Sequence, residues 1–241
     1  MSDWPAEAFF TLHRDLPREG AGEPADVAWA ASVAGLSPTA QIADVGCGPG
    51  ADIAALLAAA PEGHVTALDK VAHFAGAARA AWSDDGRVTV LQADMSRIHN
   101  EYDMIWCAGA VYFLGVAQAL TLWRKSLRPG GVVAFSQACW FTQDRSTAAR
   151  DYWAREYPEM TDEAGVLAEV EAAGYEVLGT RRLSDAAWEA YYAPMEARIA
   201  ALAPEADAVL QDILEDARQE IACWRAHREE FGYLLCVVRP T

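Results

Sequence analysis

The stretch Ala43–Asp52, ADVGCGPGAD, places an aspartate ahead of three glycines on alternate positions, Gly46, Gly48 and Gly50. A short apolar run over 41–45 leads into it, and apolar residues repeat at helical spacing from residue 52 onward. Because glycine has no Cβ, such a loop lets the backbone turn tightly and approach a ligand closely. The stretch predicts a strand, a turn and a helix around a nucleotide, with a purely structural turn as the alternative.

Short apolar runs and helical patterns continue to alternate along the chain. Four further strands are predicted, at 64–68, 87–91, 102–107 and 132–136, the last after the turn 128–131. Strands that alternate with helices form right-handed crossovers and a mostly parallel sheet with helices on both faces. Ligands bind such sheets beyond the carboxyl ends of the strands, which is where the glycine loop would lie.

The pattern changes after residue 137. Helices are predicted at 163–173, 186–202 and 205–228, and strands at 175–183 and 233–238. The helix at 205–228 has a continuous apolar stripe, which would face either the core or a second copy of the chain in a homodimer. Within a single domain, we expect an N-terminal helical cap segment over 1–37, a cofactor-binding core over 38–137 and substrate-side cap elements with the last strands over 138–241.

Composition narrows the function classes. The chain has 241 residues, 53% of them hydrophobic, which is enough for one sizeable core. Its formal net charge of −16 disfavours nucleic acid and anionic membranes as partners. The five cysteines are widely spaced and no CxxC or HxxxH pair occurs, so we expect reduced thiols and no metal site.

Two stretches bear on location. The N-terminus lacks the basic and apolar regions of a secretory signal, which favours a cytoplasmic protein. Residues 104–123 carry no charge and are long enough to span a bilayer, but Gly109, Gly115 and a change from strand to helix periodicity interrupt them. We therefore predict a buried strand, a loop and a helix there, and no membrane partner.

The carboxylates that follow the strands indicate the ligand. By its glycines the loop fits a nicotinamide dinucleotide, since it passes the relaxed GxGxxA fingerprint and Asp69 lies where a ribose-binding acid belongs. A P-loop is excluded because no Gly-Lys-Ser/Thr follows. Asp94 and Met95, after the third strand, have no use in a dinucleotide site, whereas S-adenosylmethionine needs an acceptor for its adenine amino group. Helix capping is the alternative for both aspartates.

Each position then has a physical task. The loop glycines would let the main chain approach the methionyl and ribose groups, and Asp44 would lie near the ammonium or sulfonium charge. Asp69 would accept hydrogen bonds from both ribose hydroxyls. Asp94 would accept from the adenine amino group, with Met95 as apolar cover.

The segments ADVGCGPG, ALDK, QADM and SLRPGG, in this order and spacing, resemble the class I S-adenosylmethionine-dependent methyltransferases over about 42–137. Weaker similarity in FFTLHRDLPREGAG, IWCAGAVYFLG, QACWFT and WEAYYAPMEARIA points to a bacterial small-molecule methyltransferase subgroup. The resemblance implies a Rossmann-like α/β fold: a seven-stranded, mostly parallel sheet of order 3-2-1-4-5-7-6 with an antiparallel last strand, helices on both faces and a helical cap.

The resemblance also implies the ligands. S-Adenosyl-L-methionine would be the cofactor and S-adenosyl-L-homocysteine the product, and Cys47, Lys70 and Ala108 join the expected cofactor contacts. The family often has a glutamate at the position of Ala108, so no acidic catalytic role is carried over to this strand end.

Methyl transfer from a sulfonium is an in-line displacement that depends largely on alignment, so catalytic residues leave few marks in a sequence. We predict His13 as a general base and Tyr112, on the loop that faces the methyl donor, as a second catalytic residue. Arg18 would pair with the methionyl carboxylate. Aromatic residues from separate segments are expected to line the acceptor pocket, with core packing as their alternative: Phe10, Tyr112, Trp140, Trp188 and Tyr192.

The sequence thus predicts an enzyme that methylates a small molecule with S-adenosylmethionine. A non-catalytic S-adenosylmethionine-binding or regulatory protein and an NAD-dependent oxidoreductase are the alternatives. A macromolecular methyltransferase is a further one, although the net charge of −16 disfavours RNA and DNA. No motif encodes the acceptor or its reacting atom.

Overall fold

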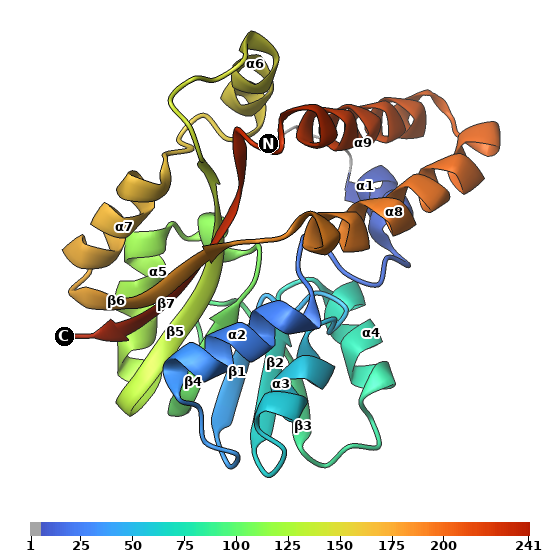
Figure 1. The fold of residues 1–241 in the computed structure, drawn as a ribbon. Coiled ribbons are helices and arrows are strands. Elements are labelled where there is room, and N and C mark those ends of the chain that lie inside the picture. The colour runs from blue at the N-terminus through green and yellow to red at the C-terminus, as the bar shows by residue number, and fades with distance from the viewer. Residues whose placement is uncertain (1–5) are drawn as a thin grey trace.

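The computed structural model describes residues 6–241, whose strands form one sheet in the order β3-β2-β1-β4-β5-β7-β6 (Figure 1). The strands are β1 (Gln41–Val45), β2 (His64–Asp69), β3 (Val88–Gln92), β4 (Tyr102–Cys107), β5 (Leu127–Trp140), β6 (Tyr175–Arg182) and β7 (Phe231–Pro240). The pairs from β3 to β5 are parallel, whereas β7 runs antiparallel to both β5 and β6. This confirms the predicted fold class and strand order.

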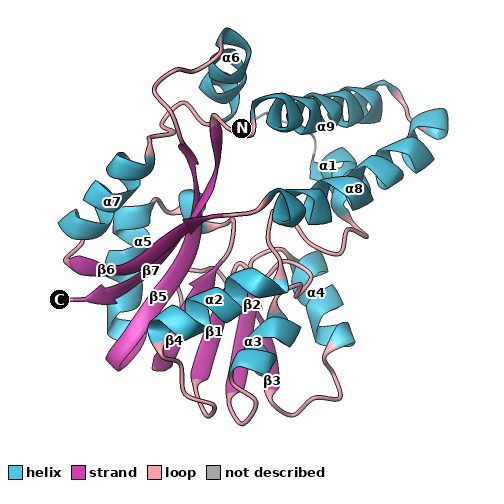
Figure 2. Cartoon of the chain, in the orientation of Figure 1, coloured by secondary structure: helices cyan, strands magenta, loops and turns pink. Residues whose placement is uncertain are grey.

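Helices cover both faces of the sheet, and a further group lies beyond one end of it (Figure 2). The helices are α1 (Ala6–His13), α2 (Pro24–Ala34), α3 (Ile53–Ala59), α4 (Ala72–Ala81), α5 (Val116–Trp123), α6 (Thr147–Glu156), α7 (Glu163–Ala172), α8 (Asp185–Leu202) and α9 (Ala208–His227). Short 3₁₀ turns are η1 (Val111–Phe113), η2 (Arg124–Ser126) and η3 (Ala203–Glu205).

Alternate residues of the central strands divide the core into two layers. Ile42 of β1 packs in the layer that contains residues of α2 and α3, and the next residue, Ala43, packs in the layer with α5 and α7. Both residues are completely buried. Strands covered on both faces read as continuous apolar runs, which is why the central strands could be found from sequence.

Helices α1, α8 and α9, with α6 beside them, form a cap beyond the carboxyl ends of the parallel strands (Figure 1). Arg198 of α8 joins two of these helices, since Nε and Nη2 donate to the carbonyls of Leu12 and Thr11 at 2.7 and 2.8 Å. Arg225 of α9 donates to the carboxylates of Glu189 and Glu196. The cap therefore holds the N-terminal helix over the same sheet edge as the glycine loop.

Two elements differ from the expectation. The stretch 128–131 was expected to be a turn before the fifth strand, but it lies inside β5, where Gly130 has φ +81° and the register with β4 shifts between Tyr102 and Met104. Helix α6 was not predicted, because its sequence TAARDYWARE has too few apolar residues to show a periodic stripe. It begins at Ser146, whose hydroxyl accepts from the amide of Ala149 at 3.2 Å.

Two open questions about apolar stretches are answered. Residues 104–123 form β4, η1 and α5, as predicted, and no helix within 6–241 combines the length and apolarity that crossing a bilayer requires. The stripe of α9 faces the core, because Ile213, Leu214, Ala217, Ile221 and Trp224 are buried within the chain.

Candidate functional site

The glycine loop is fixed to the end of β2. The amides of Gly46 and Cys47 donate to the Leu68 carbonyl at 2.8 and 3.0 Å. The amide of Gly48 donates to Asp69 Oδ2 at 2.9 Å. Gly46 has φ +73°, and a Cβ on it would lie 2.7 Å from the Cβ of Ala110 in the loop after β4. Glycine at this position is therefore required by both backbone conformation and close approach.

Asp69 and Asp94 lie at the ends of neighbouring strands, but they differ in how many carboxylate lone pairs remain free for a ligand. Each oxygen of Asp69 accepts one backbone amide, from Gly48 and from Val71 at 2.8 Å, which leaves a second lone pair on each for a hydroxyl. Burial raises the pKa of Asp69, and these two hydrogen bonds partly offset the rise. In Asp94, Oδ1 accepts from the amide and hydroxyl of Ser96 at 3.0 and 2.7 Å, so Oδ2, which has the exposed Lys70 as its ion-pair partner, is the oxygen with a lone pair left for a ligand.

Asp44 is the least compensated charge of the site. Its side chain is 3% exposed, and Oδ2 has no hydrogen-bond partner among the described residues. Burial raises its pKa well above the usual range, the charges of Asp52 and Asp69 raise it further, and Arg18 lowers it only in part. A buried carboxylate without a partner is costly, so the site fits a ligand that brings a positive charge to this place.

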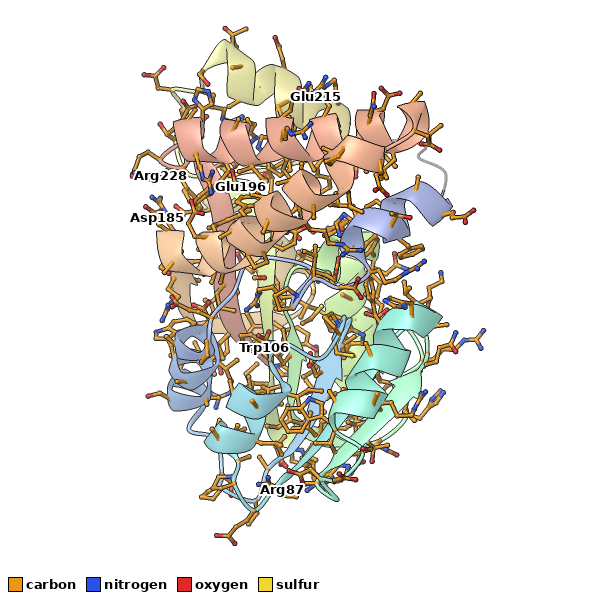
Figure 3. All side chains as sticks on the ribbon, turned by 90° about the vertical axis from the view of Figure 1, so that its right-hand side faces the viewer. Arg87, Trp106, Asp185, Glu196, Glu215 and Arg228 are labelled. Atoms are coloured by element: carbon orange, nitrogen blue, oxygen red, sulfur yellow. The ribbon has the colours of Figure 1, made fainter. Side chains whose placement is uncertain are left out.

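Arg18 and Asp52 connect the N-terminal segment to the loop. Arg18 Nε donates to the Gly20 carbonyl at 2.6 Å, and Nη2 donates to Asp52 Oδ1 at 3.2 Å. The indole of Trp106 donates to Asp52 Oδ2 at 2.9 Å, inside the body of the molecule below the cap (Figure 3). Arg18 therefore lies beside the loop, as its expected role requires, with Nη1 left over for a further acceptor.

The remaining residues that were expected to contact the cofactor differ in exposure and in what they pack against. Met95 lies over the loop, with Cε 3.6 Å from the position of a Gly46 Cβ. The side chain of Lys70 is 79% exposed, and its Nζ lies 3.4 Å from Asp94 Oδ2. Burial raises the pKa of Cys47, so this thiol is an apolar filler of the loop and not a nucleophile. Ala108 packs partly buried against the core at the end of β4.

His13 belongs to a hydrogen-bonded pair. Its Nδ1 lies 2.7 Å from Glu19 Oε2, and its ring stacks on Phe9 with centroids 4.0 Å apart. Glu19 Oε1 is buried without a partner among residues 6–241, and its Cγ lies 3.4 Å from the position of a Gly48 Cβ. Glu19 thus lies next to the glycine loop, and its carboxylate orients the imidazole of His13. Phe10 contacts Phe74 of α4 at 5.9 Å between centroids.

The expected aromatic residues fall into separate groups. Trp188 lies at the centre of one, with ring centroids 4.9 Å from Tyr233, 5.3 Å from Trp224 and 5.5 Å from Tyr192. Tyr112, in η1 after β4, contacts Tyr157 at 6.2 Å. Trp140 packs instead against Phe231 at the end of β5, and among the described residues no ring contact joins it to the Trp188 group.

Several residues near the site received no role from the sequence: Asp52, Gln137, Glu220 and Tyr233. Glu19, by contrast, was expected among the pocket elements of the N-terminal segment. Gln137 is buried, and its Oε1 has no partner within the described part of the chain. Glu220 offered a signal, because it lies three residues after Ala217 and four before Trp224, on the apolar stripe of α9. The other three lack a local pattern that marks them.

Comparisons with known proteins agree with this arrangement. Residues 42–131 match a family model described as a methyltransferase domain. No protein with a curated description matches the chain significantly. An S-adenosylmethionine-dependent methyltransferase from Geobacter sulfurreducens, crystallised with S-adenosyl-L-homocysteine, is 21% identical, has a TM-score of 0.81, and covers 100% of both chains.

Two further solved structures are similar to the same extent. A methyltransferase from Thiobacillus denitrificans, also in complex with S-adenosyl-L-homocysteine, is 21% identical over 100% of both chains with a TM-score of 0.79. YjhP from E. coli is 21% identical over 98% of this chain and 100% of its own, with a TM-score of 0.80. Residues 42–131 are therefore similar to a methyltransferase domain, and the chain has the fold of the class I S-adenosylmethionine-dependent methyltransferases.

Proposed function

We propose that this protein is an S-adenosylmethionine-dependent methyltransferase that acts on a small molecule. The observation that carries the proposal is the set of carboxylates at successive strand ends, Asp44, Asp69 and Asp94, around a loop in which Gly46 cannot bear a side chain. The buried oxygen of Asp44 that has no hydrogen-bond partner favours a ligand with a positive charge next to the loop. S-Adenosylmethionine has such a group at this position, and NAD does not. The net charge of −16 supports a small molecule over nucleic acid as the acceptor.

The residues present fit this cofactor. Asp44 would face the ammonium of the methionyl group, and Arg18 would hold its carboxylate. Asp69 keeps a free lone pair on each oxygen for the ribose hydroxyls, and Asp94 keeps Oδ2 for the adenine amino group. When bound, the sulfonium supplies an activated methyl group for in-line transfer.

The chain itself supplies alignment and a base. We assign the general base to His13, because the carboxylate of Glu19 orients its ring and the pair lies beside Gly48. Burial raises the pKa of the Tyr112 hydroxyl, and the charge of Glu220 raises it further, so this phenol stays protonated and can donate a hydrogen bond to an acceptor. Because residue 108 is alanine, the end of β4 offers no carboxylate as a general base. This favours the imidazole of His13 for that role.

Calorimetric titration tests the cofactor. S-Adenosyl-L-homocysteine should bind and NAD should not. Asp69→Ala should weaken nucleoside binding by about 10- to 100-fold, because charged hydrogen bonds contribute about 1.5–3 kcal/mol. Asp85→Ala is the matched control, since that aspartate pairs with Arg87 away from the site (Figure 3). Binding of NAD without the homocysteine nucleoside, or equal affinities of the two variants, would refute the assignment.

An acceptor screen that follows S-adenosyl-L-homocysteine release tests catalysis. With the best acceptor, His13→Gln should lower kcat by about 10²- to 10⁴-fold while nucleoside affinity is unchanged. Glu19→Gln should cost less, and the loss should be mainly in kcat because the ring is no longer oriented. Cofactor binding with no release on any acceptor would favour the non-catalytic alternative, and an unchanged kcat in His13→Gln would show that the base is another group.

A further inference from the structure

Glu220 of α9 is a partly buried carboxylate in the cap. The hydroxyl of Tyr192, a side chain only 1% exposed, donates to Glu220 Oε1 at 2.9 Å. Burial raises the pKa of Glu220, and the charges of Asp216 and Glu156 raise it further. The steps proposed above for methyl transfer use this group only through the effect of its charge on the pKa of Tyr112.

Glu220 faces tyrosines from several elements. Its charge raises the pKa of five tyrosine hydroxyls, although burial is the first cause for each: Tyr112 in η1, Tyr152 in α6, Tyr191 and Tyr192 in α8, and Tyr233 in β7. Of these, Tyr192 contacts the carboxylate directly, and the ring of Tyr191 lies 5.3 Å from that of Tyr192.

The cluster joins the candidate site at two points. On one side, the ring of Tyr233 lies 3.7 Å from the position of a Gly109 Cβ, in the loop after β4 that faces the methyl donor. From Tyr233 a path of ring contacts runs through Trp188 to Tyr192 and so to Glu220. On the other side, the charge of His13 lowers the pKa of Glu220, which places the carboxylate near the proposed base.

Glu220 has no basic partner of its own. Within residues 6–241 no arginine or lysine forms an ion pair with it, although arginines pair with Glu189 and Glu196 on the neighbouring helix α8. A carboxylate that lies beside a group of packed aromatic rings and forms no ion pair with arginine or lysine is complementary to one kind of group. Cationic nitrogen is attracted both by the charge and by the ring faces, at about 0.5–2 kcal/mol per ring.

We propose that the methyl acceptor carries a cationic nitrogen, an amine or a quaternary ammonium, which Glu220 and the surrounding tyrosines hold beside the methyl group. The proposal rests on the proposed methyltransferase function and names the substrate class of that site. Glu220 selects the acceptor by its positive charge. The tyrosines select it by the size of the cation that fits against their ring faces.

A matched pair of probes tests the proposal. Choline and its uncharged carbon isostere, 3,3-dimethylbutan-1-ol, are titrated into the full chain saturated with S-adenosyl-L-homocysteine. Choline should bind at least about tenfold more tightly, since one charge–charge and cation–π contact contributes about 1.4 kcal/mol or more. In Glu220→Gln this preference should disappear, while the affinity for S-adenosyl-L-homocysteine and the melting temperature show that the variant is folded.

Glu215→Gln is the control on the same helix. Glu215 lies on the outer side of α9 (Figure 3), its side chain is 58% exposed, and its loss should leave the preference unchanged. Equal affinity for the two probes, no binding of either to the nucleoside complex, or an undiminished preference in Glu220→Gln would overturn the proposal. Failure of S-adenosyl-L-homocysteine itself to bind would instead refute the methyltransferase function, so the two failures are distinguishable.

Discussion

At the scale of single residues, Asp44 shows the conflict between stability and binding. It is buried in β1 with one oxygen unpartnered, next to two other carboxylates whose charges oppose its ionisation. A side chain chosen only for stability at this position would be apolar or neutral. A costly buried group beside a glycine loop is typical of a site that awaits a complementary ligand.

Replacement of this carboxylate should separate the two effects. Because the pKa of Asp44 is raised in the folded chain, the folded state holds the proton more tightly than the unfolded state does. Its stabilising contribution is complete below about pH 4 and is lost as the pH rises through the raised value. Asp44→Asn should therefore raise the melting temperature of the ligand-free protein at about pH 8, and by less as the pH falls toward 5.

The same variant should bind S-adenosyl-L-homocysteine at least about tenfold less tightly, through loss of a charged contact. Thermal melts across this pH range and calorimetry measure the two quantities. A variant that is less stable at about pH 8, or that binds the nucleoside as tightly as the native chain, would contradict this reading of Asp44.

At the scale of elements, local sequence and local structure agree most closely in the glycine loop. The turn between β1 and α3 needs a positive φ at Gly46, and the carboxylate of Asp69 fixes its backbone to β2. In helix α9, by contrast, the residue with a proposed role is not marked by a separate local motif. Glu220 lies at helical spacing on the same stripe that packs the helix on the core. In the proposed function, one face of α9 would thus serve both the fold and the acceptor site.

Two glycine substitutions should change the free energy of unfolding in opposite directions. Gly46→Ala should destabilise the fold by at least about 1–2 kcal/mol, because alanine at φ +73° is strained and its Cβ would meet that of Ala110. Gly76→Ala, in α4, has no atom within 4 Å of the new Cβ and should stabilise by about 0.5–1 kcal/mol through helix propensity. Urea unfolding measures both, and a neutral Gly46→Ala would mean that the loop relaxes freely.

At the scale of the whole molecule, charge is the dominant feature. The chain has 35 acidic and 19 basic residues, and several of the basic ones are used in pairs that join elements, such as Arg181 with Asp26 and Arg128 with Asp103. The excess negative charge repels itself over the surface, and this destabilises the compact state. The same excess keeps polyanions away while leaving the site open to small cations.

Screening should relieve this repulsion. Raising the ionic strength from about 0.01 M to 0.15 M shortens the Debye length from about 30 Å to about 8 Å. The melting temperature should rise by about 2–4 °C for each kcal/mol of repulsion removed. The gain should shrink as the pH is lowered into the carboxyl range, where the net charge falls. A melting temperature that decreases with salt at neutral pH would show that attractive ion pairs outweigh the repulsion.

The sequence by itself determined the sheet, the glycine loop and the order of its carboxylates. Each depends on spacing within about 30 residues, and burial on both faces gives the central strands their continuous apolar runs. It did not determine α6 or the full length of β5, because α6 has no periodic stripe and a glycine-containing bulge resembles a turn.

Only the tertiary structure decided which side chains meet at the site. Asp52 accepts from the indole of Trp106 across 54 positions, and Glu220 of α9 accepts from the hydroxyl of Tyr192 of α8 across 28 positions. Periodicity states which face of an element is buried, but not which residue of another element will lie against it. That choice depends on how the helices cross and pack above the sheet, and in the cap it brought Glu220 of α9 into contact with Tyr192 of α8.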